Sequence, residues 1–170
     1  MGYLLVLGGA RSGKSDLAHR LAVESARGVT FVATATPGDE EMAQRIADHR
    51  TSRPPDWSTV EAPLELDAAI RAAPDGDFLI VDCLTLWVAN LLGAGRTAGE
   101  IRALAERVAG EMAGRRGVVV SNEVGLGIVP ANELARAFRD VLGAVNIVFA
   151  ECSERSVLMV AGRMLELKAT

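Results

Sequence analysis

A glycine-rich octapeptide near the start of the chain constrains the fold more than any other feature. An apolar run, Tyr3–Leu7, precedes the octapeptide, and an amphipathic stretch follows it. The pattern G-x-x-x-x-G-K-S/T is met by Gly8, Gly9, Ala10, Arg11, Ser12, Gly13, Lys14 and Ser15. In this context of strand, loop and helix, the pattern is typical of sites for nucleoside triphosphates.

The residue types of this segment suit phosphate chemistry. Glycine allows positive φ and a close backbone approach, so successive N–H groups and the start of the next helix can surround phosphate oxygens. We expect the Lys14 ammonium to reach the β- and γ-phosphates. We expect Ser15 to ligate Mg²⁺, which bridges phosphate oxygens in such sites. A glycine-rich turn that binds nothing is the alternative, but the whole context favours a binding site.

Composition favours one compact domain that does not bind nucleic acid. The chain has 170 residues, of which 49% are hydrophobic and 24% charged, and this length predicts a single domain over residues 1–170. The net charge of −4 lacks the basic character of nucleic-acid-binding proteins. The 4% of aromatic residues are also too few for a base-stacking surface.

The cysteines and the lack of long apolar runs favour a cytoplasmic protein. Cys83 and Cys152 are isolated and have no C-x-x-C spacing, which argues against a zinc site and against a disulfide framework. The first apolar run is too short for a signal peptide, and no run approaches the ~18 apolar residues of a membrane segment.

Apolar runs alternate with amphipathic stretches along the chain. Strands are predicted at Tyr3–Leu7, Val29–Thr34, Phe78–Asp82, Gly117–Ser121 and Ser156–Val160, with a short extended piece at Trp57–Glu61. Helices are predicted at Lys14–Ala26, Asp39–His49, Leu64–Ala72, Thr85–Leu92, Ala98–Ala113 and Ala131–Leu142. The alternation predicts an α/β fold with a largely parallel, twisted sheet flanked by helices. Val145–Ala150 stays open between strand and helix, because β-branched residues argue for a strand but no turn signal precedes them.

Asp82 is the candidate acid for the metal. It ends the apolar strand Phe78–Asp82, which is where phosphate-loop proteins place a carboxylate that holds Mg²⁺ directly or through water. An aspartate that caps the next helix is the alternative interpretation. We favour the metal site, because proteins of this kind need such an acid.

The two histidines differ in context. His19 lies inside the first predicted helix, where packing or solvent contact is the better interpretation. His49 lies at the end of the second predicted helix beside Arg45, Arg50 and Arg53. These cations can hold a triphosphate, and neutral imidazole can attack the α-phosphorus to form a covalent intermediate. From spacing alone, a solvated histidine at a helix end is equally consistent.

Further segments occur in one order along nearly the whole chain. They are Ala33-Thr34-Ala35, Asp39-x-Glu41-Met42, Arg45-Ile46-x-x-His49, Trp57-x-Thr59-x-Glu61, Asp82-Cys83-Leu84-Thr85 and Asn122-Glu123-Val124-Gly125-x-Gly127-Ile128-Val129-Pro130. Together with the octapeptide, they resemble the bifunctional adenosylcobinamide kinase and adenosylcobinamide-phosphate guanylyltransferase family of cobalamin biosynthesis. The last segment is the most specific, because generic phosphate-loop proteins do not carry it.

The resemblance implies a RecA-like P-loop NTPase fold, a homotrimer and two reactions. The first phosphorylates the aminopropanol hydroxyl of adenosylcobinamide with ATP or GTP. The second transfers GMP from GTP onto that phosphate, with His49 as the guanylylated residue and with Lys14 and Mg²⁺ neutralising phosphate charge. The nucleotide contacts that the resemblance implies are the octapeptide Gly8–Ser15, Thr34, Ala35, Thr36, Arg50, Thr51, Ser52, Arg53, Glu61 and Asp82.

Several points stay open at this stage. A phosphate-loop kinase without nucleotidyltransferase activity and a RecA-type regulatory ATPase are the alternative functions. The sequence does not distinguish ATP from GTP in the kinase step, since no Asn-Lys-x-Asp motif occurs. Asn122 and Glu123 are expected to line the active site, because polar residues just past a parallel strand lie where ligands bind; alternatively, Glu123 caps the helix after Pro130. Hydrophobicity alone suggests as corrinoid contacts Leu86, Trp87, Leu126, Ile128 and Val129.

Overall fold

The computed structural model describes residues 2–38, 40–51 and 53–169. Its centre is a seven-stranded sheet of order β3-β2-β4-β5-β1-β6-β7. The strands are Tyr3–Gly8 (β1), Val29–Ala33 (β2), Ser58–Glu61 (β3), Phe78–Asp82 (β4), Gly117–Val120 (β5), Arg155–Val160 (β6) and Arg163–Leu167 (β7). Neighbouring strands are parallel except for β6 and β7, which form an antiparallel pair.

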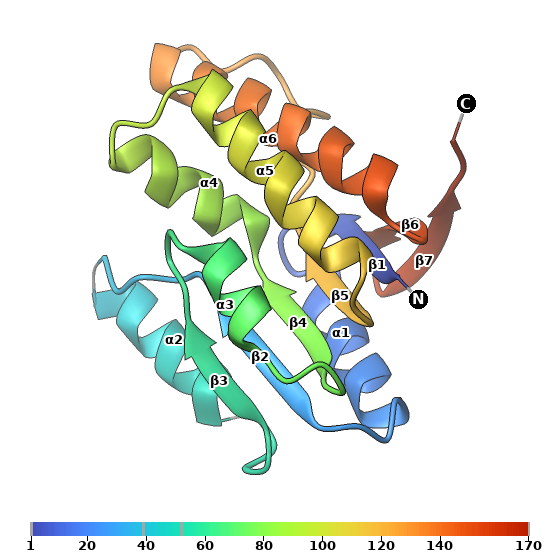
Figure 1. The fold of residues 1–170 in the computed structure, drawn as a ribbon. Coiled ribbons are helices and arrows are strands. Elements are labelled where there is room, and N and C mark those ends of the chain that lie inside the picture. Colours follow the sequence, from blue (N-terminus) through green and yellow to red (C-terminus); the bar gives the residue numbers. More distant parts are fainter. Residues whose placement is uncertain (1, 39, 52, 170) are drawn as a thin grey trace.

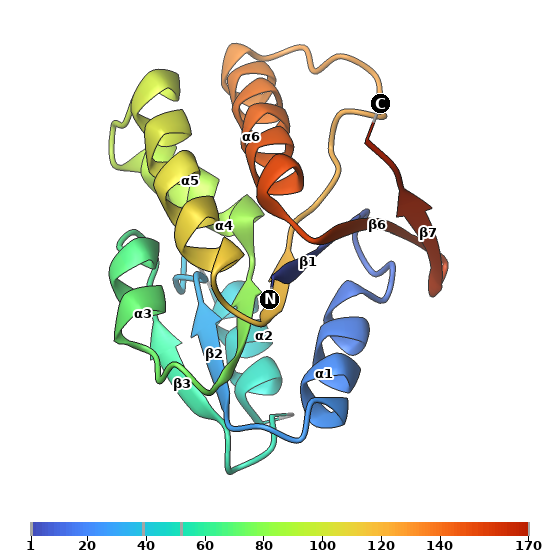
Figure 2. The same cartoon turned by 45° about the vertical axis from the view of Figure 1, so that its right-hand side comes forward.

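Helices cover both faces of this sheet (Figures 1 and 2). The helices are Lys14–Glu24 (α1), Glu40–Thr51 (α2), Leu66–Ala72 (α3), Leu84–Gly93 (α4), Ala98–Ala113 (α5) and Glu133–Cys152 (α6). The buried apolar residues of α3, α4, α5 and α6 share one cluster with side chains of the sheet, and those of α1 share a second cluster. The predicted α/β architecture with a mostly parallel sheet flanked by helices is therefore confirmed.

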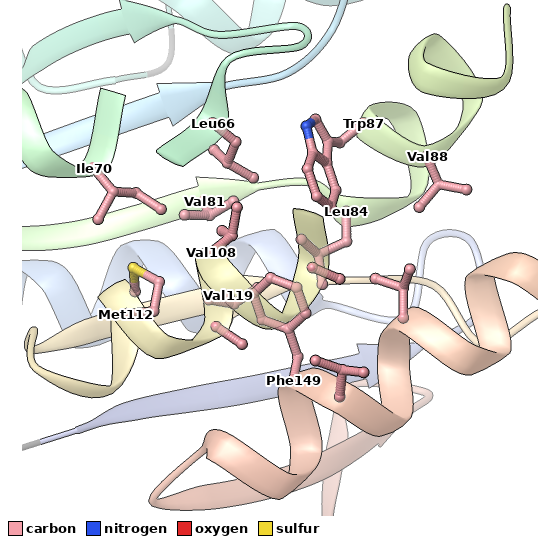
Figure 3. Close-up of a cluster of buried hydrophobic side chains, with 14 of the residues drawn as sticks. Leu66, Ile70, Val81, Leu84, Trp87, Val88, Val108, Met112, Val119 and Phe149 are labelled. Atoms are coloured by element: carbon pink, nitrogen blue, oxygen red, sulfur yellow. The ribbon is translucent and has the colours of Figure 1, made fainter. Parts of the chain in front are cut away.

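The larger cluster fixes α4 beside the end of β4. Figure 3 shows Trp87 and Leu84 of α4 packed among Val81, Val119 and Phe149. Trp87 is fully buried, and its indole N–H donates to the Leu64 carbonyl at 2.9 Å. Burial of an aromatic side chain of this size contributes several kcal/mol. The first turn of α4, which directly follows Asp82 and Cys83, is thereby held in place.

The segment left open between strand and helix belongs to α6. Val145, Val148 and Phe149 are buried, whereas Ile147 is 60% exposed. This spacing is that of one apolar face of a helix, not the alternation of a strand. Packing of that face against α5 and the sheet outweighs the β-propensity of valine and isoleucine.

β7 was not predicted, and its composition explains why. All five of its residues are exposed, so no face of β7 shows the apolar alternation of a half-buried strand. The β6–β7 connection is the two-residue turn Ala161-Gly162, with φ of 50° and 71°. Positive φ at both central positions is the geometry of a tight β-hairpin turn, and Gly162 was the available signal.

Candidate nucleotide-binding site

The octapeptide connects β1 to α1 as a loop in which the backbone geometry at Gly8 and Gly13 requires glycine. Gly8 has φ of 153°, and a Cβ at this position would lie 2.5 Å from the Met159 carbonyl oxygen. Gly13, which precedes α1, has φ of 95°. The β6–β7 turn supports the loop, because the Gly162 N–H donates to the Ser12 carbonyl at 3.0 Å. The loop therefore has a defined shape in which backbone N–H groups precede a helix, as in anion sites.

Lys14 lies in the first turn of α1 and turns back towards the loop. Its side chain is 8% exposed, and Nζ donates to the carbonyls of Gly8 at 2.9 Å and Gly9 at 2.6 Å. Burial lowers the pKa of Lys14 below its ordinary value, while the negative charge of Asp82 acts in the opposite direction. A buried ammonium of this kind is a strong partner for phosphate oxygens.

The carboxyl ends of the parallel strands open into a cavity of about 340 Å³. β4 ends at Asp82, and β5 lies between β4 and β1 in the sheet. The cavity lining comes from the loop, from α2 and the segment after it, from the strand ends and the segments that follow them, and from the first turn of α4. The lining residues are Ala10, Arg11, Lys14, Ser15, Ala33, Ala35, Ile46, Arg50, Arg53, Glu61, Asp82, Cys83, Thr85, Leu86, Val120 and Asn122. Its size falls at the lower end of ordinary ligand pockets.

Of the three residues that follow β2, one lines this cavity and two do not. Ala35 lines it, but Thr34 is fully buried and its hydroxyl is already bonded. Thr34 Oγ1 donates to the Cys83 carbonyl at 2.7 Å and accepts from the Cys83 N–H at 2.8 Å. Thr36 is exposed and pairs with Asn90 at 3.4 Å. Thr34 thus ties the ends of β2 and β4 together, and only Ala35 of the three reaches the cavity wall.

Two arginines bring positive charge to the cavity wall. Arg50, near the end of α2, forms an ion pair with Glu61 of β3. Arg53 lies with its guanidinium carbon 3.7 Å from the centroid of the Phe31 ring and donates to Thr59 Oγ1 at 3.3 Å. Partial burial lowers the pKa of Arg53, and Asp82 opposes that shift. Stacking on a buried ring holds this cation in one orientation.

Position 49 lies in the last turn of α2, one residue before Arg50 and three after Ile46, both of which line the cavity. The His49 side chain lies outside the described part of the structure, as does Ser52. Thr51 is exposed, and its hydroxyl donates to the Ala47 carbonyl at 2.9 Å. His19 packs with its ring centroid 4.9 Å from that of Trp57, which agrees with the packing role expected for it.

In the segment after β5, Asn122 faces the cavity and Glu123 does not. Asn122 lines the cavity, whereas the Glu123 carboxylate accepts from the Gly125 N–H at 2.6 Å. The alternative in which Glu123 caps the following helix is wrong, because Asn132 caps α6 by accepting from the Ala135 N–H at 2.7 Å.

The apolar residues considered for a corrinoid surface are divided in the same way. Trp87 is wrong as a candidate, because it is fully buried in the core. Leu86 reaches the cavity wall. The remaining three are exposed: Leu126, Ile128 and Val129 are 82%, 97% and 62% exposed.

The sequence assigned no bonding role to two asparagines whose side chains bond the segments that follow the strands. Asn90 donates to the carbonyls of Thr34 at 2.8 Å and Pro63 at 3.1 Å, and Asn146 bonds to the segment after β5. Each is a carboxamide on a helix that packs against the core. The available signal for Asn146 was a polar residue within the apolar run Val145–Phe149.

A second cavity of about 470 Å³ lies at the opposite edge of the sheet, where β1, β4 and β5 begin. It contains no residue of the octapeptide, and its charged lining mixes Glu24 and Glu154 with Arg27, Arg116 and Arg155. Ligands of open α/β sheets bind beyond the carboxyl ends of the strands. The smaller cavity is therefore the candidate nucleotide site.

Comparison with known proteins agrees with this geometry. Residues 4–167 match the family model described as cobinamide kinase / cobinamide phosphate guanyltransferase. The chain belongs to this family. It is 51% identical to the Pseudomonas aeruginosa protein named bifunctional adenosylcobalamin biosynthesis protein CobP, over 96% of each chain. It is 40% identical to the Salmonella typhimurium protein named bifunctional adenosylcobalamin biosynthesis protein CobU, over 97% of this chain and 99% of the relative. The resemblance stated from the sequence is thus confirmed, and with it the expectation of an enzyme of this family.

Solved structures of low identity share the fold alone. The ATPase EscN of the enteropathogenic E. coli type III secretion system superposes with a TM-score of 0.63 at 9% identity, over 94% of this chain and 43% of EscN. The RadB recombinase superposes with a TM-score of 0.54 at 16% identity, over 92% of this chain and 73% of RadB. The predicted RecA-like P-loop NTPase fold is confirmed.

Within the described residues, no helix combines the length and apolar character that a membrane crossing requires.

Proposed function

We propose that this family member phosphorylates the aminopropanol hydroxyl of adenosylcobinamide and then transfers GMP from GTP onto the new phosphate. The match of residues 4–167 to the cobinamide kinase / cobinamide phosphate guanyltransferase family carries the proposal. The cavity supports it, since the phosphate loop, Asp82 and the end of α2 meet there. ATP or GTP serves the kinase step, and GTP serves the transferase step.

In this proposal, Lys14 and the N–H groups of the loop bind the β- and γ-phosphates. Arg50 and Arg53 neutralise charge at the end of the cavity beside α2. The imidazole of His49 attacks the α-phosphorus of GTP, pyrophosphate leaves, and the corrinoid phosphate then takes GMP from the histidine. The family relationship and the neighbours of position 49 on α2 support this role, which divides nucleotidyl transfer into two displacements.

Mg²⁺ is the proposed metal, and the chemistry of the donors suits it. Ser15 and Asp82 both line the cavity and offer the oxygen ligands that Mg²⁺ prefers. When bound, the ion would neutralise charge on the bridging and leaving phosphate oxygens. The described residues include no group of three or more His, Cys, Asp or Glu side chains placed to hold a metal by themselves.

Two radioactive labels test the proposal. With GTP labelled at the α-phosphate and no corrinoid, the protein is expected to retain label after denaturation. With triphosphate labelled at the γ-phosphate, adenosylcobinamide is expected to become labelled. A folded, nucleotide-binding protein that gives only the second product would be a kinase without transferase activity. One that gives neither product, but hydrolyses ATP faster with a protein partner, would favour the regulatory ATPase.

We further propose that the protein assembles as a homotrimer. Exposed apolar side chains on the loop before α6 and on its first turn support self-association: Leu126, Ile128, Val129 and Leu134. Light scattering after size exclusion is expected to give three times the chain mass of 17.9 kDa. A mass equal to that of one chain at micromolar concentration would contradict the trimer. Addition of single-stranded DNA is expected to change neither this mass nor the reaction rates.

A further inference from the structure

The strand order of the sheet places the end of β5, and Asn122 just after it, between the phosphate loop and Asp82. Val120, the last residue of β5, pairs with Asp82 of β4 on one side and with Val6 of β1 on the other. Asn122 follows two residues later, and the Glu123 N–H donates to the Gly8 carbonyl at 3.2 Å. Asn122 therefore lies beside the start of the phosphate loop on one side and near Asp82 on the other. In phosphate-loop enzymes, the loop and such an acid lie on either side of the terminal phosphate.

The backbone of Asn122 is held on both sides. Its N–H donates to Thr85 Oγ1 at 2.8 Å, and its carbonyl accepts from Asn146 Nδ2 at 3.0 Å. Asn146 is 6% exposed, and its Oδ1 accepts from the buried Ser121 hydroxyl at 2.7 Å. Because the backbone N–H and the backbone carbonyl of Asn122 are both hydrogen-bonded, the backbone is fixed there, and the side chain can point in few directions. Thr85 and Asn146 are therefore positioning residues for Asn122.

The side-chain amide of Asn122 makes no hydrogen bond that would give it a structural role among the described residues. Among the described residues, neither its oxygen nor its NH₂ group makes a hydrogen bond, although Asn122 lies on the cavity wall. A primary amide carries two donors and one acceptor without charge. It can donate to a phosphate oxygen and accept from a hydroxyl, and so hold the two reacting groups of a phosphoryl transfer together.

We propose that Asn122 is a catalytic residue of the phosphoryl-transfer step. This inference rests on the proposed kinase function of the same cavity. The Asn122 NH₂ group donates to an oxygen of the γ-phosphoryl group, and its carbonyl orients the attacking hydroxyl. The hydroxyl oxygen forms the new bond to phosphorus, the bond from phosphorus to the β,γ-bridging oxygen breaks, the nucleoside diphosphate leaves, and the hydroxyl proton passes to water.

The two half-reactions separate this role from a general structural one. GMP transfer breaks the bond between the α- and β-phosphates, so a contact at the γ-phosphoryl group contributes little to it. Asn122→Ala is expected to lower the kcat of corrinoid phosphorylation by about 10²-fold, as for loss of one transition-state donor. The covalent GMP label formed at saturating GTP is expected to stay within about threefold of wild type.

A variant series guards against misfolding. Asn122→Asp keeps the size of the side chain but replaces donors with a carboxylate, and is expected to raise the KM for the triphosphate as well as lower kcat. Val124→Ala, a change at a residue of the same loop that does not line the cavity, is expected to leave both rates unchanged. Thermal melting curves of all variants check folding.

Four outcomes are distinguishable. A drop in kinase rate with retained GMP labelling supports the inference. Equal kinase rates for wild type and Asn122→Ala overturn it, as does a parallel loss of both reactions. If wild type itself labels no corrinoid while binding the triphosphate, the proposed kinase function fails, and Asn122 loses the reaction assigned to it.

Discussion

Replacing His49 with alanine is expected to abolish the covalent GMP label while kinase activity stays within about threefold of wild type. Alanine provides no nucleophile for the α-phosphorus, so the first displacement of GMP transfer cannot occur. The proposed kinase step does not use the imidazole of His49, so it should persist. The measurement compares α-labelled GTP on the denatured protein with γ-label on the corrinoid.

The other histidine of the chain is the matched control. His19 lies on α1, packed against Trp57 and outside the cavity lining, so His19→Ala should keep the label. A phosphorus–nitrogen bond is labile in acid and stable in base, which distinguishes it from phosphoesters. Cys83 also lines the cavity, but burial raises the pKa of its thiol to about 11, so it stays protonated at neutral pH. Label that survives in His49→Ala would assign the nucleophile elsewhere.

Replacing Lys14 with alanine is expected to slow both reactions by about 10³-fold, because each builds negative charge on phosphate oxygens beside the loop. The Lys14 ammonium is buried against the loop carbonyls, and no other lysine lines the cavity. Initial rates of both half-reactions, with nucleotide affinity by calorimetry, check this. A variant that loses only one reaction would show that the two steps bind their triphosphates differently.

The ionisation of Lys14 provides a second readout. Burial lowers its pKa, and bound phosphate favours the protonated form, so affinity for the triphosphate should fall as pH rises through that pKa. Lys14→Arg carries a guanidinium that stays charged over this range. It should bind more weakly at neutral pH, because its geometry differs, but should not show the alkaline decline. The same decline in both proteins would assign the titration to another group.

The β1–loop–α1 unit was predictable because its determinants are local. Glycine at positions 8 and 13 permits φ values that other residues rarely adopt, and the apolar run before them needs no partner to be recognised. The position of Asp82 at the end of β4 was predictable for a similar reason, since Phe78–Asp82 is a short apolar run. β7 was not predicted, because it has no buried face. The second half of α6 was left open between strand and helix, because it is rich in β-branched residues.

Contacts between distant segments illustrate the opposite case. The sequence did not predict that the Thr34 hydroxyl bonds Cys83, nor that Trp87, which was considered for a ligand surface, lies in the core. Asn146 follows Asn122 by 24 residues and reaches it only because α6 packs beside β5. Such contacts depend on which strands are neighbours, and residue spacing does not contain that information.

Family, fold class and the strand–loop–helix unit of the octapeptide could be read from the amino-acid order alone, because short motifs and hydrophobic periodicity encode them locally. The shape of the cavity depended on the three-dimensional arrangement. β5 had to lie between β1 and β4 before Lys14, Asp82 and Asn122 could share one wall. Long-range pairing is set by the packing of whole faces of helices and sheet, and for this reason it became visible only in the folded chain.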